Sequence, residues 1–219
     1  MKTIKILGIP LIIILFLTIS IPFQSCEPDD DDYECDTCIV AYKPNIYLYP
    51  KEQIQLFVKL DFPMGGKIVK SIPEYGTGWN ITVDKNGLIN NTYSYLFYES
   101  TQPDIWQKDY GWITKTDELE PFFRKNMADY GFTGREIDDF IDYWIPQLNN
   151  YSFYSIYPQT KQLIDKVIKL DLSKKPDHLL RLFYVVKGHN QSQEKLLEPT
   201  IADFNRDGYF VTEWGVILK

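Results

Sequence analysis

The stretch that decides the fold class is Thr133-Gly134-Arg135-Glu136-Ile137-Asp138-Asp139-Phe140-Ile141-Asp142-Tyr143-Trp144-Ile145-Pro146. Thr133 with Glu136 matches a capping box, in which each residue satisfies a free N–H group at the start of a helix. Apolar side chains then recur at helical spacing, at Ile137, Phe140, Ile141 and Trp144. Pro146 cannot continue a helix, so the sequence predicts an amphipathic helix that ends there.

A second helix is predicted upstream, over residues 119–130. Pro121 fits its first turn, where a missing N–H is harmless, and Gly131 fits the left-handed position that ends many helices. Strand-like alternation flanks both helices, at residues 53–60, 79–83, 93–98, 152–157, 167–172, 180–187 and 209–218. Residues 160–169 fit a helix or a strand. We therefore expect an α+β fold with antiparallel, sandwich-like β structure and a two-helix insertion between the strand groups.

Composition indicates an ordered globular protein that does not bind nucleic acid. The 219 residues are 44% hydrophobic and include 16 Tyr and 5 Trp, enough for a large core. Acidic residues outnumber basic ones by 30 to 23, and the sequence has no basic stripe. The net charge of −7 repels a phosphate backbone, so nucleic acid is excluded as a partner.

Residues 1–25 are typical of an export signal. A basic start precedes an apolar run over residues 6–21, and Cys26 follows a small residue. This pattern resembles a bacterial lipoprotein signal, and the acidic run at residues 27–32 resembles the surface-export signal of Bacteroidetes lipoproteins. The resemblances imply an exported protein held at the outer membrane, on the cell surface, by a lipid on Cys26. The alternative is a transmembrane anchor, although the apolar run is shorter than the roughly 20 residues that span a bilayer.

Residues 26–42 are predicted to form an acidic tether, followed by a single α+β domain over residues 43–219. The tether contains Cys35 and Cys38, and in an exported protein we expect a disulfide between them. A redox motif would need a strand before the pair and a helix after it, which the sequence does not indicate. A zinc site is the other alternative, but it would need histidines from far along the chain.

Four landmarks connect the chain to a protein family. They are KPNIYLYP at residues 43–50, YLFYE at 95–99, REIDDFIDYWIP at 135–146 and EWG at 213–215. In this order they resemble an uncharacterised family of exported bacterial proteins and lipoproteins with KPxIYLYP, YLFxE, REIxDFIxYWxP and EWG motifs. The resemblance covers nearly all of the expected domain. It implies membership of a family without an assigned activity, and therefore no mechanism.

Glu99 and Glu213 are the candidate catalytic residues. Each lies near the end of an aromatic strand, where apolar surroundings raise the pKa of a carboxyl group and suit it to general acid catalysis. Two carboxylates across a cleft would support glycoside hydrolysis. The alternative is a structural role, because buried carboxylates are normally paired, and Arg181 is the expected partner. The two histidines, His178 and His189, are expected in surface loops, so histidine-based catalysis is not expected.

Two segments carry oxygen ligands that suit a divalent cation. Asp203, Asn205 and Asp207 have the alternate spacing of a calcium loop and precede a glycine. A simple turn into the last strand is the alternative. The second segment is the acidic face of the helix over 135–144, with Asp138, Asp139 and Asp142. Its alternative is a solvated helix face. Apart from calcium, no cofactor is expected.

The function that the sequence favours is binding of an extracellular ligand, in particular a glycan. Tyr75, Trp79, Tyr95 and Trp214 are the candidate ligand-binding residues, because large flat rings offer rigid contact area to a ligand. A glycosidase-like hydrolase that uses the two glutamates is the rival hypothesis. A scaffold component of an envelope complex is the third, and a large flat apolar patch would support it.

Overall fold

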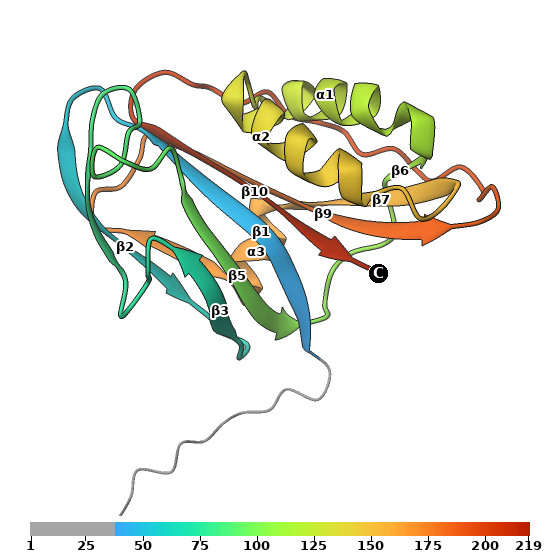
Figure 1. The fold of residues 1–219 in the computed structure, drawn as a ribbon, viewed down its shortest axis with the longest axis horizontal. Coiled ribbons are helices and arrows are strands. Elements are labelled where there is room, and N and C mark those ends of the chain that lie inside the picture. The colour runs from blue at the N-terminus through green and yellow to red at the C-terminus, as the bar shows by residue number, and fades with distance from the viewer. Residues whose placement is uncertain (1–37) are drawn as a thin grey trace, which may run out of the picture. The chain divides into compact units, whose positions relative to one another are not determined.

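The computed structural model describes residues 38–219. Its strands are β1 Cys38–Tyr49, β2 Ile54–Asp61, β3 Lys67–Ile72, β4 Trp79–Val83, β5 Leu96–Pro103, β6 Trp112–Lys115, β7 Phe153–Thr160, β8 Lys169–Leu172, β9 His178–His189 and β10 Phe210–Leu218. Its α-helices are α1 Leu119–Tyr130, α2 Arg135–Trp144 and α3 Lys161–Val167. Seven strands form one sheet in the order β3-β5-β1-β10-β9-β7-β6, and three form another in the order β4-β2-β8 (Figure 1).

All paired strands in this part of the chain are antiparallel except β9 and β10. These two run parallel, with Glu213 opposite Arg181. Residues 190–209 connect them, which is the long crossover that a parallel pair needs. The predicted α+β class, with sandwich-like sheets and two helices inserted between strand groups, is confirmed.

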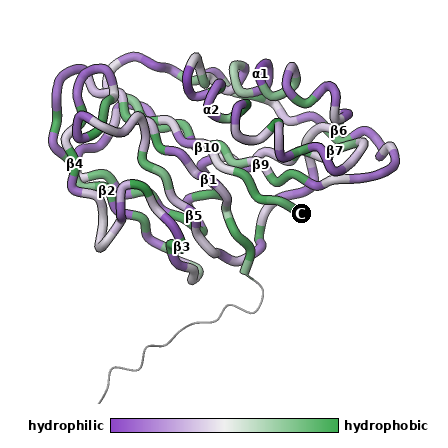
Figure 2. Tube along the Cα trace, in the orientation of Figure 1, coloured by the Kyte–Doolittle hydropathy of each residue, from purple (hydrophilic) through white to green (hydrophobic). Residues whose placement is uncertain are grey.

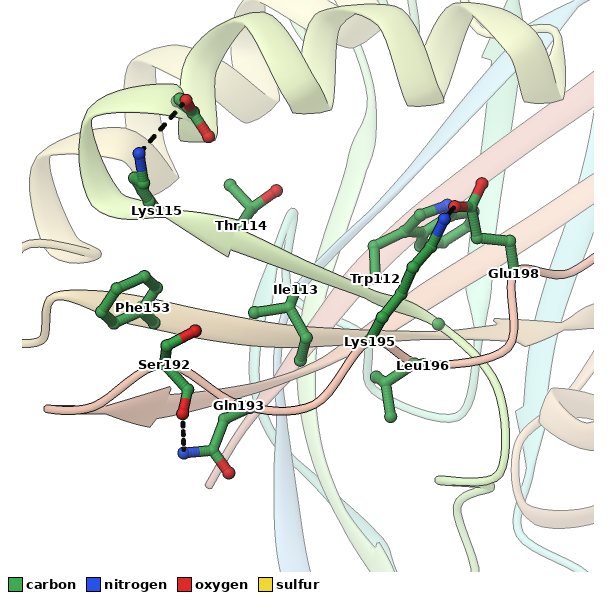
Figure 3. A pocket seen from close by; sticks show the side chains of 12 residues that line it. Trp112, Ile113, Thr114, Lys115, Phe153, Ser192, Gln193, Lys195, Leu196 and Glu198 are labelled. Carbon is green, nitrogen blue, oxygen red and sulfur yellow. Dashed lines mark hydrogen bonds and ion pairs between the residues drawn. The ribbon is translucent and has the colours of Figure 1, made fainter.

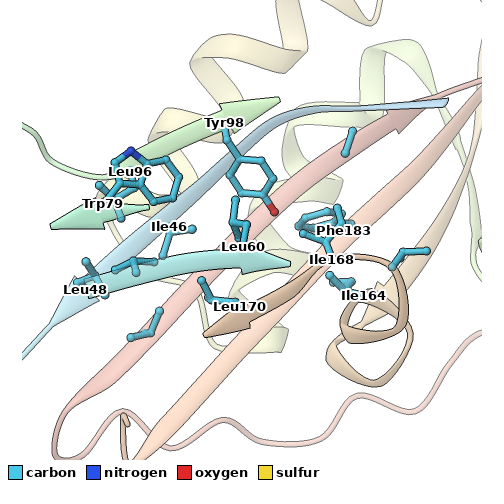
Figure 4. Close-up of a cluster of buried hydrophobic side chains, with 14 of the residues drawn as sticks. Ile46, Leu48, Leu60, Trp79, Leu96, Tyr98, Ile164, Ile168, Leu170 and Phe183 are labelled. Carbon is cyan, nitrogen blue, oxygen red and sulfur yellow. The ribbon is translucent and has the colours of Figure 1, made fainter. Parts of the chain in front are cut away.

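Alternation along the central strand β1 explains the three layers of the domain. Ile46 and Leu48 belong to a core between the two sheets, which also holds Trp79 and Phe183 (Figure 4). Tyr47, between them, belongs to a second core under α1 and α2. Hydrophobic residues recur along β1, β9 and β10, which carry side chains of both cores (Figure 2).

Both predicted helices are present. α1 has the predicted bounds, and Gly131 ends it in the left-handed conformation, with φ 102° and its N–H bonded to the Ala128 carbonyl oxygen. At α2 only half of the capping box forms. The Thr133 N–H donates to Glu136 Oε2 at 2.8 Å, but Gly134 occupies the cap position and makes no side-chain cap bond.

The structure corrects two sequence predictions. β1 begins at Cys38 and pairs there with Pro103, so residues 38–42 belong to the sheet and not to a tether. His178 and His189 lie at the two ends of β9, not in loops.

The predictions for residues 1–37 lie outside the described residues. They comprise the signal, the lipidated Cys26, the acidic run and Cys35. Cys38 is disulfide-bonded. No helix of the described part is long and apolar enough to cross a membrane.

Candidate functional site

Glu99 and Glu213 point to opposite faces of the seven-stranded sheet. Ile46 of β1 lies between Leu96 of β5 and Glu213 of β10, so these residues share the face toward the small sheet. Glu99 is three residues beyond Leu96, and its side chain therefore points to the other face. The sheet separates the two carboxylates, so they cannot act across one cleft as the predicted glycosidase-like pair.

Glu213 is fully buried and paired with Arg181, as the structural alternative predicts. Arg181 Nε donates to Glu213 Oε2, and the Tyr98 hydroxyl donates to Oε1 at 2.7 Å. Arg181 Nη1 donates to Asp165 Oδ1 at 2.7 Å and to the Ile168 carbonyl oxygen at 2.5 Å. Burial, followed by the Glu213 charge, raises the pKa of Tyr98 well above its usual range. These contacts make Glu213 part of the core between the sheets.

Two of the four aromatic residues predicted to bind a ligand have almost no exposed surface. Trp79 is 2% exposed and Trp214 is 0% exposed, so neither ring can stack on a sugar at the surface of this structure. Tyr75 is half-buried, and its hydroxyl exchanges hydrogen bonds with the backbone of Leu60. Tyr95 lines a pocket.

A salt bridge organises the predicted calcium segment. The two terminal nitrogens of Arg206 each lie 3.0 Å from a carboxylate oxygen of Glu136 in α2. Glu136 is fully buried, and the Thr212 hydroxyl donates to it at 2.7 Å. Asn205 Oδ1 accepts the Asp207 N–H, as in a tight turn. Across residues 38–219, no three His, Cys, Asp or Glu residues gather in an arrangement that could hold a metal ion.

Replacing Arg206 by lysine should lower the free energy of unfolding by about 1.5–3 kcal/mol, because a hydrogen bond to a charged group contributes in that range. Lysine keeps the charge but lacks the planar fork that reaches both Glu136 oxygens. Urea denaturation measures the change. Arg124→Lys is the matched control, since Arg124 pairs with Glu120 and Asp138 in the open and exposed pairs add little. Equal effects of the two substitutions would contradict this role for Arg206.

The structure brings three of the landmark stretches together at one pocket, which we call the Lys43 pocket. Lys43 comes from β1, Phe97 and Glu99 from β5, and Tyr143 from α2. The pocket has a volume of about 270 Å³ and is lined by Lys43, Lys70, Ile72, Tyr93, Ser94, Tyr95, Phe97, Glu99 and Tyr143. It opens on the helix-covered side of the large sheet, to which Glu99 points.

Lys43 occupies a strained β-bulge. The register of β1 shifts against both neighbouring strands just before Asn45. Lys43 has φ 56°, a left-handed conformation that costs a residue with a Cβ atom about 1–2 kcal/mol. Within the described chain, the other non-glycine residues with positive φ are Asn90 and Asn91, and asparagine tolerates this conformation. Bulges and strained residues of this kind concentrate at functional sites.

Three aromatic rings surround the half-buried side chain of Lys43. Its Nζ lies 4.8 Å from the ring centroids of Phe97 and Tyr143 and 5.5 Å from that of Tyr95. These distances permit cation–π attraction. Burial, the largest effect, lowers the pKa of Lys43, and the charges of nearby carboxylates oppose it. The rings therefore pack around an ammonium group that is half-buried.

Asp139 is a half-buried neighbour of this site on α2. The Tyr47 hydroxyl donates to Asp139 Oδ2 at 2.9 Å. Burial raises the pKa of Asp139, whereas the Tyr47 bond and the charges of Arg135 and Lys43 lower it. Asp138, also in the predicted acidic cluster, instead makes an exposed ion pair with α1. The carboxylates of Asp138 and Asp139 therefore contact different partners, Arg124 of α1 and Tyr47 of β1.

A second pocket, of about 310 Å³, lies beside the edge strand β6 (Figure 3). Its charged side chains are paired with one another, in the ion pairs Lys115–Glu118 and Lys195–Glu198. In the Lys43 pocket, by contrast, none of Lys43, Lys70 and Glu99 forms an ion pair with another residue of 38–219. The Lys43 pocket therefore offers a ligand more charged groups that lack an ion-pair partner among these residues than the pocket beside β6 does.

No sequence pattern predicts the contact between the side chains of Ser155 and His189. Ser155 Oγ lies 2.8 Å from His189 Nε2 beside a pocket of about 490 Å³. Such a pair resembles a nucleophile and its base, but Ser155 is 2% exposed and offers a substrate little access. We assign this pair to the packing of β7 against β9.

No family model, no curated protein and no solved structure matches this chain. A function is therefore inferred from the geometry of the Lys43 pocket. The sequence patterns point to Tyr95 and Glu99 of this pocket but not to Lys43, Lys70 or Tyr143 as site residues. The signal that could have found Lys43 is its place before Pro44 in a strand, where the chain departs from regular pairing.

Proposed function

We propose that this protein is an exported lipoprotein whose domain binds one sugar unit of an extracellular glycan in the Lys43 pocket. The observation that supports this most directly is the convergence of β1, β5 and α2 on one small pocket with aromatic walls. The strained backbone of Lys43 supports it as well, because residues in such conformations cluster at binding and active sites. The lipoprotein part of the proposal rests on the export signal and Cys26.

The composition of the lining suits a sugar. Small-molecule sites are mostly apolar and carry a few polar groups that orient the ligand. Here Tyr95, Phe97 and Tyr143 supply rings, while Glu99 and Ser94 offer hydrogen-bond partners for hydroxyl groups. The volume of about 270 Å³ lies just below the range of most small-molecule sites, which begins near 300 Å³. A single unit of a longer chain would fit this space.

Recognition is a better match to this geometry than hydrolysis by the two predicted glutamates. Glu99 borders the pocket, but Glu213 is sealed on the other side of the sheet by Arg181 and Tyr98. A retaining or inverting glycosidase places both carboxylates beside one glycosidic bond. The two residues therefore do not supply that chemistry together.

Replacing Tyr95 by alanine should weaken glycan binding about tenfold, because a stacked ring contributes on the order of 1 kcal/mol beyond its buried area. Isothermal titration against a panel of soluble neutral and acidic polysaccharides would measure this change. Tyr151→Ala is the control, since Tyr151 is 43% exposed and lies outside the pocket lining. The proposal fails if the wild-type protein binds no member of the panel, or if both variants bind as the wild type does.

A further inference from the structure

Two lysine ammonium groups border the Lys43 pocket and share one aromatic ring. Lys43 Nζ lies 4.8 Å and Lys70 Nζ 5.5 Å from the ring centroid of Phe97. The two lysines come from different strands, β1 and β3. Neither forms an ion pair with a carboxylate of residues 38–219. Two like charges in one pocket repel each other, so an anion placed between them would be stabilised by both.

The charges of the lining are unequal. Two ammonium groups face one carboxylate, that of Glu99, which gives the lining a formal excess of one positive charge. Asp139 also lies near Lys43, but its carboxylate already accepts the Tyr47 hydroxyl and is close to Arg135. A ligand with one negative charge would therefore balance the lining.

The half-buried position of Lys43 strengthens this argument. An ammonium group away from bulk water gains more from an adjacent anion than an exposed one does, because the local dielectric constant is lower. Hydrogen bonds between ammonium and carboxylate groups are also shorter and stronger than neutral ones. Lys70 is exposed at the edge strand and can turn toward a bound anion without disturbing the core.

We propose that the sugar unit bound in the Lys43 pocket is acidic, such as a hexuronic acid, and that its anionic group binds between Lys43 and Lys70. This inference rests on the proposed function. Glu99 then accepts hydrogen bonds from the hydroxyl groups of the sugar, and the aromatic rings contact its apolar face.

The test compares polysaccharides that differ in this charge. The panel pairs each neutral polymer with its uronic acid counterpart: glucan with glucuronan, galactan with galacturonan, and mannan with mannuronan. We expect the wild-type protein to bind at least one acidic member about tenfold more tightly than its neutral counterpart, as charge-assisted hydrogen bonds allow. Lys70→Gln should reduce this preference to less than about threefold, because one of the two cations is lost.

Lys59→Gln is the matched control, because Lys59 is an exposed strand lysine on β2, away from the pocket lining. It should keep the full preference. If a neutral polymer binds as tightly as its acidic counterpart, or if Lys70→Gln retains the preference, this inference is wrong while glycan binding stands. If no polymer binds the wild-type protein, the proposed function fails and this inference fails with it.

Discussion

Replacing Glu213 by glutamine should lower the free energy of unfolding by about 3–5 kcal/mol, the range found when one partner of a buried ion pair is removed. Glutamine preserves the shape and can still accept the Tyr98 hydroxyl. The guanidinium of Arg181, however, would stay 0% exposed with only the partly exposed carboxylate of Asp165 beside it. Arg181 Nη2 already lacks a hydrogen-bond partner among the described residues. The substitution would therefore leave the buried guanidinium with still fewer favourable contacts. The shift of the midpoint in guanidinium chloride, at an unchanged m value, measures the loss.

Glu99→Gln is the matched control for this substitution. It makes the same chemical change on the opposite face of the sheet, where Glu99 is half-exposed and unpaired within residues 38–219. We expect a change within about 0.5 kcal/mol, as for other surface substitutions. A double variant with Arg181→Met and Glu213→Leu should recover at least half of the loss, because it removes both buried charges. If Glu213→Gln unfolds like Glu99→Gln, the buried pair is not structural.

Raising the pH from 10 to 12 should destabilise the protein steeply. Burial raises the pKa of Tyr98 and Tyr184 well above the usual range, raises that of Tyr47, and raises that of Tyr209 to about 12. In the unfolded chain each phenol ionises near its ordinary pKa of about 10. Below pH 10 both states hold these protons, and stability is complete. Above it the unfolded state loses them first, so stability falls by about 1.4 kcal/mol per pH unit for each tyrosine.

Four such residues together give a slope on the order of 5 kcal/mol per pH unit. Urea unfolding at pH 8, 10 and 11 measures it, and the ultraviolet absorbance of tyrosinate reports when the phenols ionise. Tyr98→Phe should reduce the slope by one tyrosine's share, whatever its effect on stability at neutral pH. A slope that is flat, or the same in the variant, would show that these hydroxyls reach solvent in the folded state.

Local patterns predicted most of the secondary structure correctly. The helix over 119–130 and the strand over 79–83 have the bounds that sequence indicates, and Gly131 adopts the left-handed conformation expected of it. These features depend on spacing and turn chemistry within a few residues, which the sequence contains in full. The α+β class follows from their order along the chain.

Partner choice and register were decided only by the tertiary structure. The sequence patterns point to Glu213 and Arg181 but leave both a catalytic and a structural role of Glu213 open. The parallel register of β10 on β9 places them opposite each other and decides for the structural role. Likewise the sequence did not place Tyr95 and Glu99 in one site. Pro44 signals that regular pairing breaks near Lys43, but not which side chains Lys43 then contacts.

By itself the sequence therefore determined most of the helices and strands and which side chains are apolar. The tertiary structure determined which strands are neighbours and which face each residue occupies. The physical reason is that a shift of one residue in register moves a side chain to the other face of a sheet. That choice depends on burying both cores at once, which involves segments from β1 to β10. The Lys43 pocket, assembled from β1, β3, β5 and α2, is a product of that choice.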